Sequence, residues 1–77
     1  MQVTLQKIIA ANVRALRIGR HLRQSDIAEL TDLPRTYISH LEKGEVNITV
    51  ETIERIALAL KVHPLVLLIE DAFKNVL

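Results

Sequence analysis

The sequence has no cysteine and only two glycines and two prolines, and aromatic residues make up 3% of its 77 residues. Without cysteine, neither a disulfide nor a thiolate metal site can stabilise the chain. Because aromatic rings are so few, the hydrophobic 49% of the sequence must build its core from Leu, Ile, Val and Ala. This composition favours packed helices in one domain, residues 1–77, near the lower size limit for a single stable core.

Long apolar runs are missing as well. The longest, PLVLLI at residues 64–69, is far shorter than the roughly 20 residues that a membrane-spanning helix needs. The start of the chain, MQVTLQKIIAANVRAL, lacks the basic start, apolar run and small-residue cleavage site of a signal peptide. We therefore expect a protein without membrane association, and the absence of cysteine makes a reducing cytoplasm the expected location.

Positive and negative charges nearly cancel over the whole chain but not within each half. The net charge is +1. Residues 1–43 carry seven Lys and Arg against four Asp and Glu, whereas residues 44–77 carry three against five. A basic half beside an acidic half suggests one face turned toward a polyanion. Differences of this size also arise by chance, so the charge does not identify the partner by itself.

Apolar residues recur at helical spacing in five segments, and no useful length alternates with the two-residue period of a strand. Thr4 is an expected N-cap, and the fourth segment starts after Thr49. Pro34 and Pro64 open segments in whose first turn a missing N–H is tolerated, and Gly44 ends the third. The sequence thus predicts an all-α, compact five-helix domain with helices at about residues 4–20, 24–31, 34–43, 50–61 and 64–75.

The inward faces of the first four helices follow from the same spacing. The residues expected to face the core are Leu5, Ile9, Val13, Leu16, Ile27, Ala28, Leu30, Leu33, Ile38, Leu41, Ile53, Ile56, Ala57 and Leu60.

The segment 64–75 would have two apolar sides if it were an α-helix. At about 100° per residue, Leu67 and Leu68 fall on one side, and Val66, Ile69 and Phe73 on the other. A helix at the end of a chain can bury only one side in its own domain. The second side therefore predicts a dimer interface with another copy of the chain, unless the helix is more enclosed within its own domain.

The segment LPRTYISHLEKG, residues 33–44, combines a buried face with an unusual polar one. Ile38 and Leu41 would face inward. The tight connection TDLP joins this segment to the helix before it, which gives helix-turn-helix spacing over residues 24–43. In that motif the start of the second helix enters the major groove of DNA, where Arg pairs with O6 and N7 of guanine. Instead of mixed Glu and Lys, the outward face carries Arg35, Thr36, Ser39, His40 and Lys43, with Tyr37 beside them.

The stretch RQSDIAELTDLPRTYISHLEKGEVNITVETIERIALALKV resembles the Xre/Cro–repressor helix-turn-helix family, and the resemblance covers roughly residues 5–70. Within that family, the pattern RTYISxLEKGExNIT is similar to the controller proteins of restriction–modification systems. The resemblance implies a lambda-repressor-like fold and a homodimeric transcription regulator. Such a regulator binds a roughly palindromic operator in double-stranded DNA, with its two recognition helices about 34 Å apart.

The resemblance also implies roles for individual residues. Arg17 and Glu42 would form a structural ion pair between the first and third helices. Residues 35–37 would contact base edges or nearby phosphates, and His40 would lie one turn further along the groove face. Gln24 would meet the DNA backbone at the start of the second helix, and Lys43, Asn47 and Thr49 would lie near phosphates beside the groove. The full set implied to bind DNA is Gln24, Arg35, Thr36, Tyr37, Ser39, His40, Lys43, Asn47 and Thr49.

Four positions depart from the family pattern. Arg23 stands where Thr or Ser usually caps the second helix, a loss of about 1 kcal/mol. His21 stands where Gly is common in the turn, and Pro34 replaces the polar N-cap of the third helix. Val46 stands where controller proteins tend to have Arg. The loss of that expected contact implies a different operator.

Other functions find less support. His21, His40 and His63 lie in three separate segments without the spacing of a metal site, so we expect no metal and no cofactor. No Ser–His–Asp arrangement or glycine-rich phosphate loop can be argued, so we expect no enzyme. Asp26 and Glu29 either form a solvated helix face, which is the simpler interpretation, or contact RNA polymerase. The alternatives left open are an antitoxin or other interaction module, whose last helix binds a different protein, and a phage-type repressor lacking its second domain.

Overall fold

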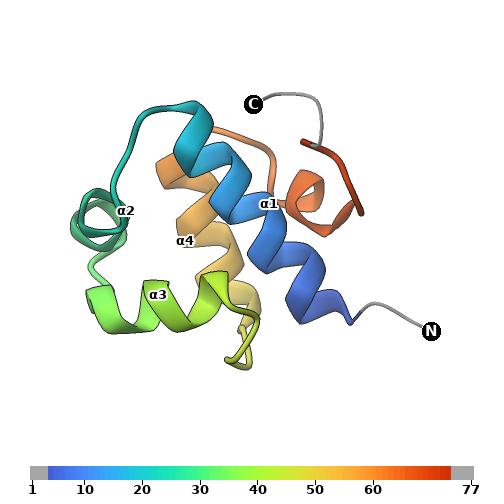
Figure 1. Cartoon of the computed structure of the whole chain (residues 1–77), viewed down its shortest axis with the longest axis horizontal. Coiled ribbons are helices and arrows are strands. Elements are labelled where there is room, and N and C mark those ends of the chain that lie inside the picture. Colours follow the sequence, from blue (N-terminus) through green and yellow to red (C-terminus); the bar gives the residue numbers. More distant parts are fainter. Residues whose placement is uncertain (1–3, 74–77) are drawn as a thin grey trace.

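The computed structural model describes residues 4–73, which contain four α-helices, one 3₁₀ helix and no strand (Figure 1). The elements are α1 (Leu5–Gly19), α2 (Gln24–Thr31), α3 (Arg35–Glu42), α4 (Val50–Leu60) and the 3₁₀ helix η1 (Pro64–Leu68). The predicted all-α class is confirmed, and the predicted bounds of the first four helices agree with the observed ones to within one or two residues.

The longest helix, α1, lies in the middle of the fold. It packs against α3, α4 and η1, and α2 packs against both α3 and α4. Figure 1 shows α1 running diagonally in front of α4, with η1 on the opposite side of α1 from α2. The core that these elements enclose consists of Ile9, Val13, Leu16, Ile27, Ile38, Leu41, Ile56, Ala57, Leu60 and Leu67.

Two residues predicted to face the core are instead exposed. Leu5 is 52% exposed and Leu30 is 60% exposed. In the short helix α2, Ile27 and Thr31 are four residues apart and share the buried face. The hydroxyl of Thr31 donates a hydrogen bond to the carbonyl of Ile27 at 2.7 Å, so burying this threonine leaves no hydroxyl without a hydrogen-bond partner. Two helical turns present one buried stripe, and Leu30 lies outside it.

The helix ends follow the predicted capping chemistry. The hydroxyl of Thr4 accepts from the backbone N–H of Lys7 at 3.3 Å, and the hydroxyl of Thr49 accepts from that of Thr52 at 3.1 Å. Gly44 has φ +73°, a conformation that favours glycine after a helix. His21 also has positive φ, at 57°, a backbone conformation in which glycine is the favoured residue.

The start of α2 is better satisfied than its Arg23 cap suggested. The side chain of Arg23 does not cap the helix. The carboxylate of Asp26 instead accepts a hydrogen bond from the backbone N–H of Arg23 at 2.7 Å, which is one half of a capping box. That backbone hydrogen bond, with help from the Arg23 side chain, lowers the pKa of Asp26 below its usual value. Asp26 therefore has a structural role at the helix start.

The predicted fifth α-helix is wrong. Residues 64–68 form the 3₁₀ helix η1, after which Ile69 is extended and turns follow through residue 73. The buried amide of Asn12 donates to the carbonyls of Leu67 and Ile69, at 2.8 and 2.9 Å. In an α-helix those two carbonyls would accept from N–H groups four residues further on. Asn12 donates to both carbonyls and ties this segment to α1, and the carbonyl of Ile69 also accepts from the N–H of Ala72 at 3.2 Å. The end of the predicted helix, residues 74–75, lies outside the described residues.

The loss of that helix also changes the predicted dimer face. Val66, Ile69 and Phe73 do not share one helical stripe, because the backbone between them is not α-helical. Ile69 is 56% exposed, whereas Val66 is half-buried and Phe73 packs against the core.

None of the helices in residues 4–73 combines the length and the apolar character needed to cross a membrane.

Candidate nucleic-acid interface

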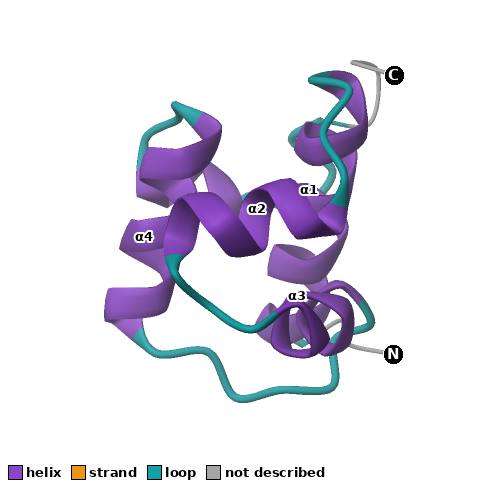
Figure 2. Ribbon diagram, turned by 90° about the vertical axis from the view of Figure 1, so that its left-hand side faces the viewer, coloured by secondary structure: helices purple, strands orange, loops and turns teal. Residues whose placement is uncertain are grey.

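The helices α2 and α3 are joined by a three-residue turn. Asp32 has φ 58°, in the left-handed region, and the N–H of Leu33 donates to the carbonyl of Ala28 at 3.1 Å. Pro34 is extended and precedes the first residue of α3, where no side chain caps the helix. In Figure 2, α3 is seen nearly end-on below α2, which runs across the view. This arrangement is the helix-turn-helix geometry that the sequence predicts.

The rotation of α3 about its axis is set by its apolar residues. Ile38 and Leu41 are both 0% exposed. Tyr37 is half-buried and packs against the core cluster, so its ring is part of the packing as well as of the surface. Because these three side chains turn inward, the polar side of α3 faces away from the domain.

Five of the predicted DNA-binding residues meet at one place. They line a shallow hollow of about 160 Å³ between the start of α2 and the outer face of α3. Arg35, Thr36 and His40 are exposed there, and Ser39 and Gln24 are half-buried. Donors and acceptors of several kinds thus converge on one surface, which is what a base-reading or phosphate-binding surface requires.

The other predicted contacts lie around this hollow rather than in it. Lys43, just after α3, is exposed and lies beside Lys7 and Arg14 of α1 at a second hollow. Asn47 and Thr49 are exposed in and after the loop that leads to α4. Thr49 is already engaged as the N-cap of α4, so part of its hydrogen-bonding capacity is used within the domain.

The loop before α4 is held by a residue that sequence reasoning missed. The amide of Gln6 donates to the carbonyl of Val46 at 2.7 Å and to the side-chain oxygen of Asn47 at 2.8 Å. The side chain of Val46 packs against the core. The valine that replaces the expected arginine therefore contributes to packing, and no sequence pattern distinguished Gln6 from other polar residues of α1.

The predicted ion pair between Arg17 and Glu42 is confirmed. Arg17 Nε lies 2.7 Å from Glu42 Oε2, and Nη2 lies 3.0 Å from Oε1, so the pair is bidentate. The two side chains are 14% and 3% exposed. Arg17 Nη1 also donates to the carbonyl of Leu22, and the amide of Gln24 donates to Glu42 Oε1 at 3.2 Å. The pair therefore joins α1, the start of α2 and the end of α3.

A second pair lies on the polar side of α3. His40 Nδ1 is 2.9 Å from Oε1 of Glu45, and both side chains are more than half exposed. The hydrogen bond from His40, aided by the nearby Lys43 and Lys7, lowers the pKa of the Glu45 carboxyl. Glu45 was not among the predicted site residues, because a lone acid in a loop carries no recognisable pattern.

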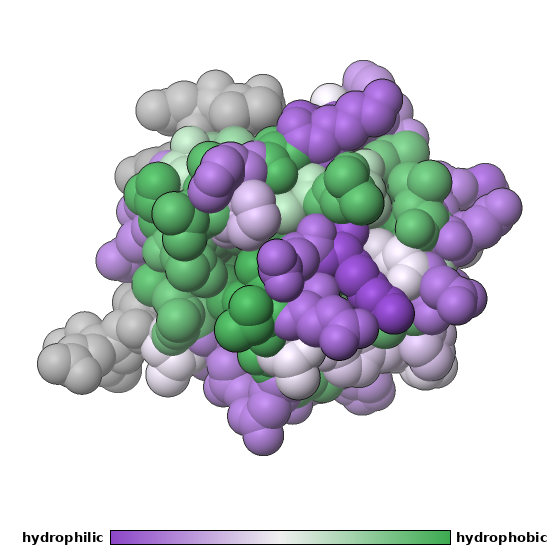
Figure 3. Space-filling model, turned by 180° about the vertical axis from the view of Figure 1, so that it is seen from behind, coloured by the Kyte–Doolittle hydropathy of each residue, from purple (hydrophilic) through white to green (hydrophobic). Residues whose placement is uncertain are grey.

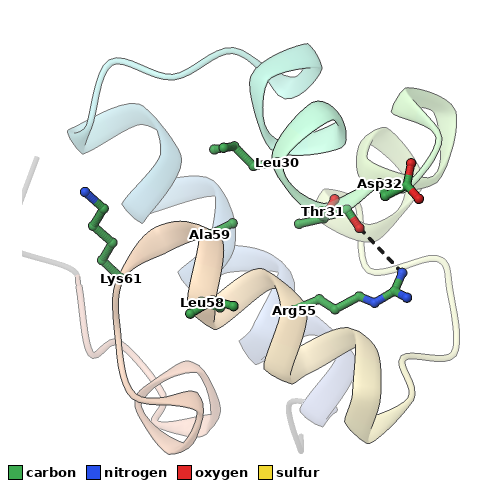
Figure 4. Close-up of a pocket in the computed structure, with 7 residues that line it drawn as sticks. All are labelled: Leu30, Thr31, Asp32, Arg55, Leu58, Ala59 and Lys61. Atoms are coloured by element: carbon green, nitrogen blue, oxygen red, sulfur yellow. Dashed lines mark hydrogen bonds between the residues drawn. The ribbon is translucent and has the colours of Figure 1, made fainter.

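Two larger hollows lie away from α3. One, of about 480 Å³, lies between the end of α2 and α4, and Leu30, Leu58 and Arg55 are among the residues that line it. Arg55 Nη1 donates to the carbonyl of Thr31 at 3.4 Å, the contact that the dashed line marks in Figure 4. The other, of about 470 Å³, lies between α4 and η1 and is mainly apolar. Among the described residues, no three His, Asp or Glu side chains are grouped closely enough to hold a metal ion.

Comparison with known proteins agrees with this geometry. The sequence pattern of the helix-turn-helix family matches residues 13–67. The chain is similar to control protein C.SmaI of Serratia marcescens, with 38% identity over 71 residues, which are 92% of this chain and 84% of that protein.

Solved structures show the same likeness. The restriction–modification controller protein C.AhdI of Aeromonas hydrophila superposes with a TM-score of 0.78 and 31% identity, over 80% of this chain and 94% of that one. The controller protein C.Esp1396I, solved as a tetramer in complex with its natural 35 base-pair operator, superposes with a TM-score of 0.79 and 28% identity over 97% of each chain.

Proposed function

The chain belongs to the helix-turn-helix family that includes the restriction–modification controller proteins, and we propose that it is a sequence-specific, DNA-binding transcription regulator rather than an enzyme. It binds a roughly palindromic operator as a homodimer, in the cytoplasm. The observation that carries the proposal is the convergence of Arg35, Thr36, Ser39, His40 and Gln24 on one surface formed by α2 and α3. No protein named above is described as an antitoxin, so that alternative gains no support.

In the proposed complex, the start of α3 enters the major groove and α2 lies across the DNA backbone. Arg35 is exposed at the first position of α3, where its planar guanidinium can donate two hydrogen bonds to O6 and N7 of a guanine. Lys43, Asn47 and Thr49 contact phosphates beside the groove. Such contacts position the protein and make its affinity depend on salt, but they do not read the sequence.

Replacing Arg35 by alanine tests the reading of bases directly. After an operator has been selected from a randomised duplex pool, Arg35→Ala should weaken operator binding by about 1–3 kcal/mol and remove the preference for guanine at one position of each half-site. Arg35→Lys keeps the charge but not the planar two-bond geometry, so it should restore general affinity and only part of the preference for guanine. Fluorescence anisotropy on operator and random duplexes measures both.

Lys43→Ala is the matched control for a phosphate contact. It should weaken binding to operator and random DNA alike and make the dependence of affinity on salt less steep, by about one unit of slope. Equal weakening of operator and random DNA by Arg35→Ala would contradict the role proposed for that side chain.

The dimer interface is proposed at the apolar surface between α4 and the C-terminal segment. Val50, Leu65 and Ile69 are 73%, 63% and 56% exposed, and the first two line the hollow of about 470 Å³. Figure 3 shows hydrophobic surface on the left of the view from behind, on the side where η1 lies. A patch of exposed apolar side chains of this kind marks an interaction site, most simply with a second copy.

A charge placed in this patch should separate the two copies. Leu65→Asp is expected to raise the dimer dissociation constant at least about tenfold, because an aspartate buried without a partner is strongly disfavoured. Leu58→Asp, at a leucine 81% exposed in the other large hollow, is the matched control and should leave the dimer intact. Sedimentation equilibrium measures the constants, and dissociation by Leu58→Asp alone would move the interface to the hollow between α2 and α4.

A contact with RNA polymerase is proposed at Glu29. This residue is exposed on α2, whereas Asp26 is engaged by the backbone of Arg23 at the helix start.

A further inference from the structure

The pair formed by His40 and Glu45 lies where the proposed complex would place it against DNA. His40 is one helical turn beyond Thr36 and lines the same hollow as Arg35 and Thr36. Its Nδ1 is 2.9 Å from Glu45 Oε1. Among residues 4–73, this is the one hydrogen bond that the His40 side chain makes, and 56% of the side chain is exposed. The imidazole is therefore held at one nitrogen and accessible to a ligand.

The carboxylate of Glu45 determines which nitrogen of His40 carries the proton. An ionised carboxylate can only accept hydrogen bonds, so Nδ1 must be the donor. In a neutral imidazole with its proton on Nδ1, the other nitrogen, Nε2, has a lone pair and can only accept. The His40 side chain would thus present a hydrogen-bond acceptor to the groove. A histidine whose tautomer is not fixed can instead present either a donor or an acceptor.

We infer that Glu45 is a positioning residue that fixes His40 as a hydrogen-bond acceptor in the major groove, so that each half-site prefers adenine or cytosine at one position of one strand. This inference rests on the proposed function. In the major groove, adenine and cytosine offer an amino group, N6 or N4, whereas guanine and thymine offer the acceptors O6 and O4 at the matching place. An acceptor on the protein therefore favours adenine and cytosine over guanine and thymine. Because every base pair has one amino group and one carbonyl at this place, the acceptor also distinguishes the two strands.

The surrounding charges favour the ionised carboxylate on which the arrangement depends. Lys43, just after α3, and Lys7 of α1 add to the effect of the His40 hydrogen bond in lowering the pKa of the Glu45 carboxyl. The lowered pKa of Glu45 keeps its carboxylate ionised near neutral pH.

The test is operator selection from a randomised duplex pool. The wild-type protein should prefer adenine or cytosine at one position by about fivefold or more. His40→Ala should remove this preference. Glu45→Gln should reduce it to below about twofold, because glutamine can donate as well as accept and so permits both tautomers.

Glu51→Gln is the control for the change of charge, since it removes an exposed carboxylate from α4, outside the hollow that His40 lines. It should raise affinity for all duplexes slightly and leave every base preference as it is. The inference is overturned if His40→Ala or Glu45→Gln leaves every base preference unchanged. In either case, a base preference lost in Arg35→Ala would still support the proposed function. Equal binding of all duplexes by the wild-type protein would contradict both the inference and the proposed function.

Discussion

Replacing Glu42 by alanine is expected to lower the free energy of unfolding by about 3–5 kcal/mol, a large share of the roughly 5–15 kcal/mol that stabilises a typical domain. The change leaves the guanidinium of Arg17, only 14% exposed, without its bidentate partner. It also removes the acceptor for the amide of Gln24 at the start of α2. Urea unfolding followed by circular dichroism measures the loss.

Two controls separate the effect of burial from the effect of charge. Glu51→Ala breaks the exposed pair with Arg55, whose atoms lie 3.3 Å apart, and should cost less than about 1 kcal/mol. The double variant Arg17→Met with Glu42→Leu should recover most of the stability lost in Glu42→Ala, because no unpaired charge is left inside. A loss in Glu42→Ala no larger than that in Glu51→Ala would show that the pair does not brace the domain.

The second large loss of stability is expected for a substitution at Leu60, a core residue of α4. Leu60→Ala should lower the free energy of unfolding by about 2–5 kcal/mol, because this side chain is 0% exposed and its removal leaves a cavity in the core. Leu58→Ala, two residues earlier and 81% exposed, should change it by no more than about 0.5 kcal/mol. The same urea measurement compares the two variants, and similar losses would contradict the packing of α4.

The contrast between these leucines was predictable from sequence, as was much of the fold. Helical spacing placed Leu60 among the inward residues and did not place Leu58 there. The bounds predicted for α2, residues 24–31, are those observed. Thr4 and Thr49 cap the starts of α1 and α4, and Gly44 follows the end of α3, as predicted. Periodicity and capping depend on residues a few positions apart, so they can be read along the chain.

The candidate site was predictable in part and for two different reasons. The outward direction of Arg35, Thr36 and His40 follows from the burial of Ile38 and Leu41 on the same short helix. The pair of Arg17 with Glu42, 25 residues apart, could not be derived from spacing and came from the family resemblance. The DNA contacts themselves stay predictions until an operator is found.

The sequence by itself determined the helical class, the positions of α1 to α4 and the polar face of α3, because each depends on chemistry within one or two helical turns. The tertiary structure decided the rest. The amide of Asn12 donates to carbonyls 55 and 57 residues away, in the segment predicted as an α-helix and observed as a 3₁₀ helix followed by extended backbone. Gln6 holds a loop about 40 residues away. Such contacts depend on how the helices pack in space, and no local pattern records which distant carbonyl a buried polar side chain will meet.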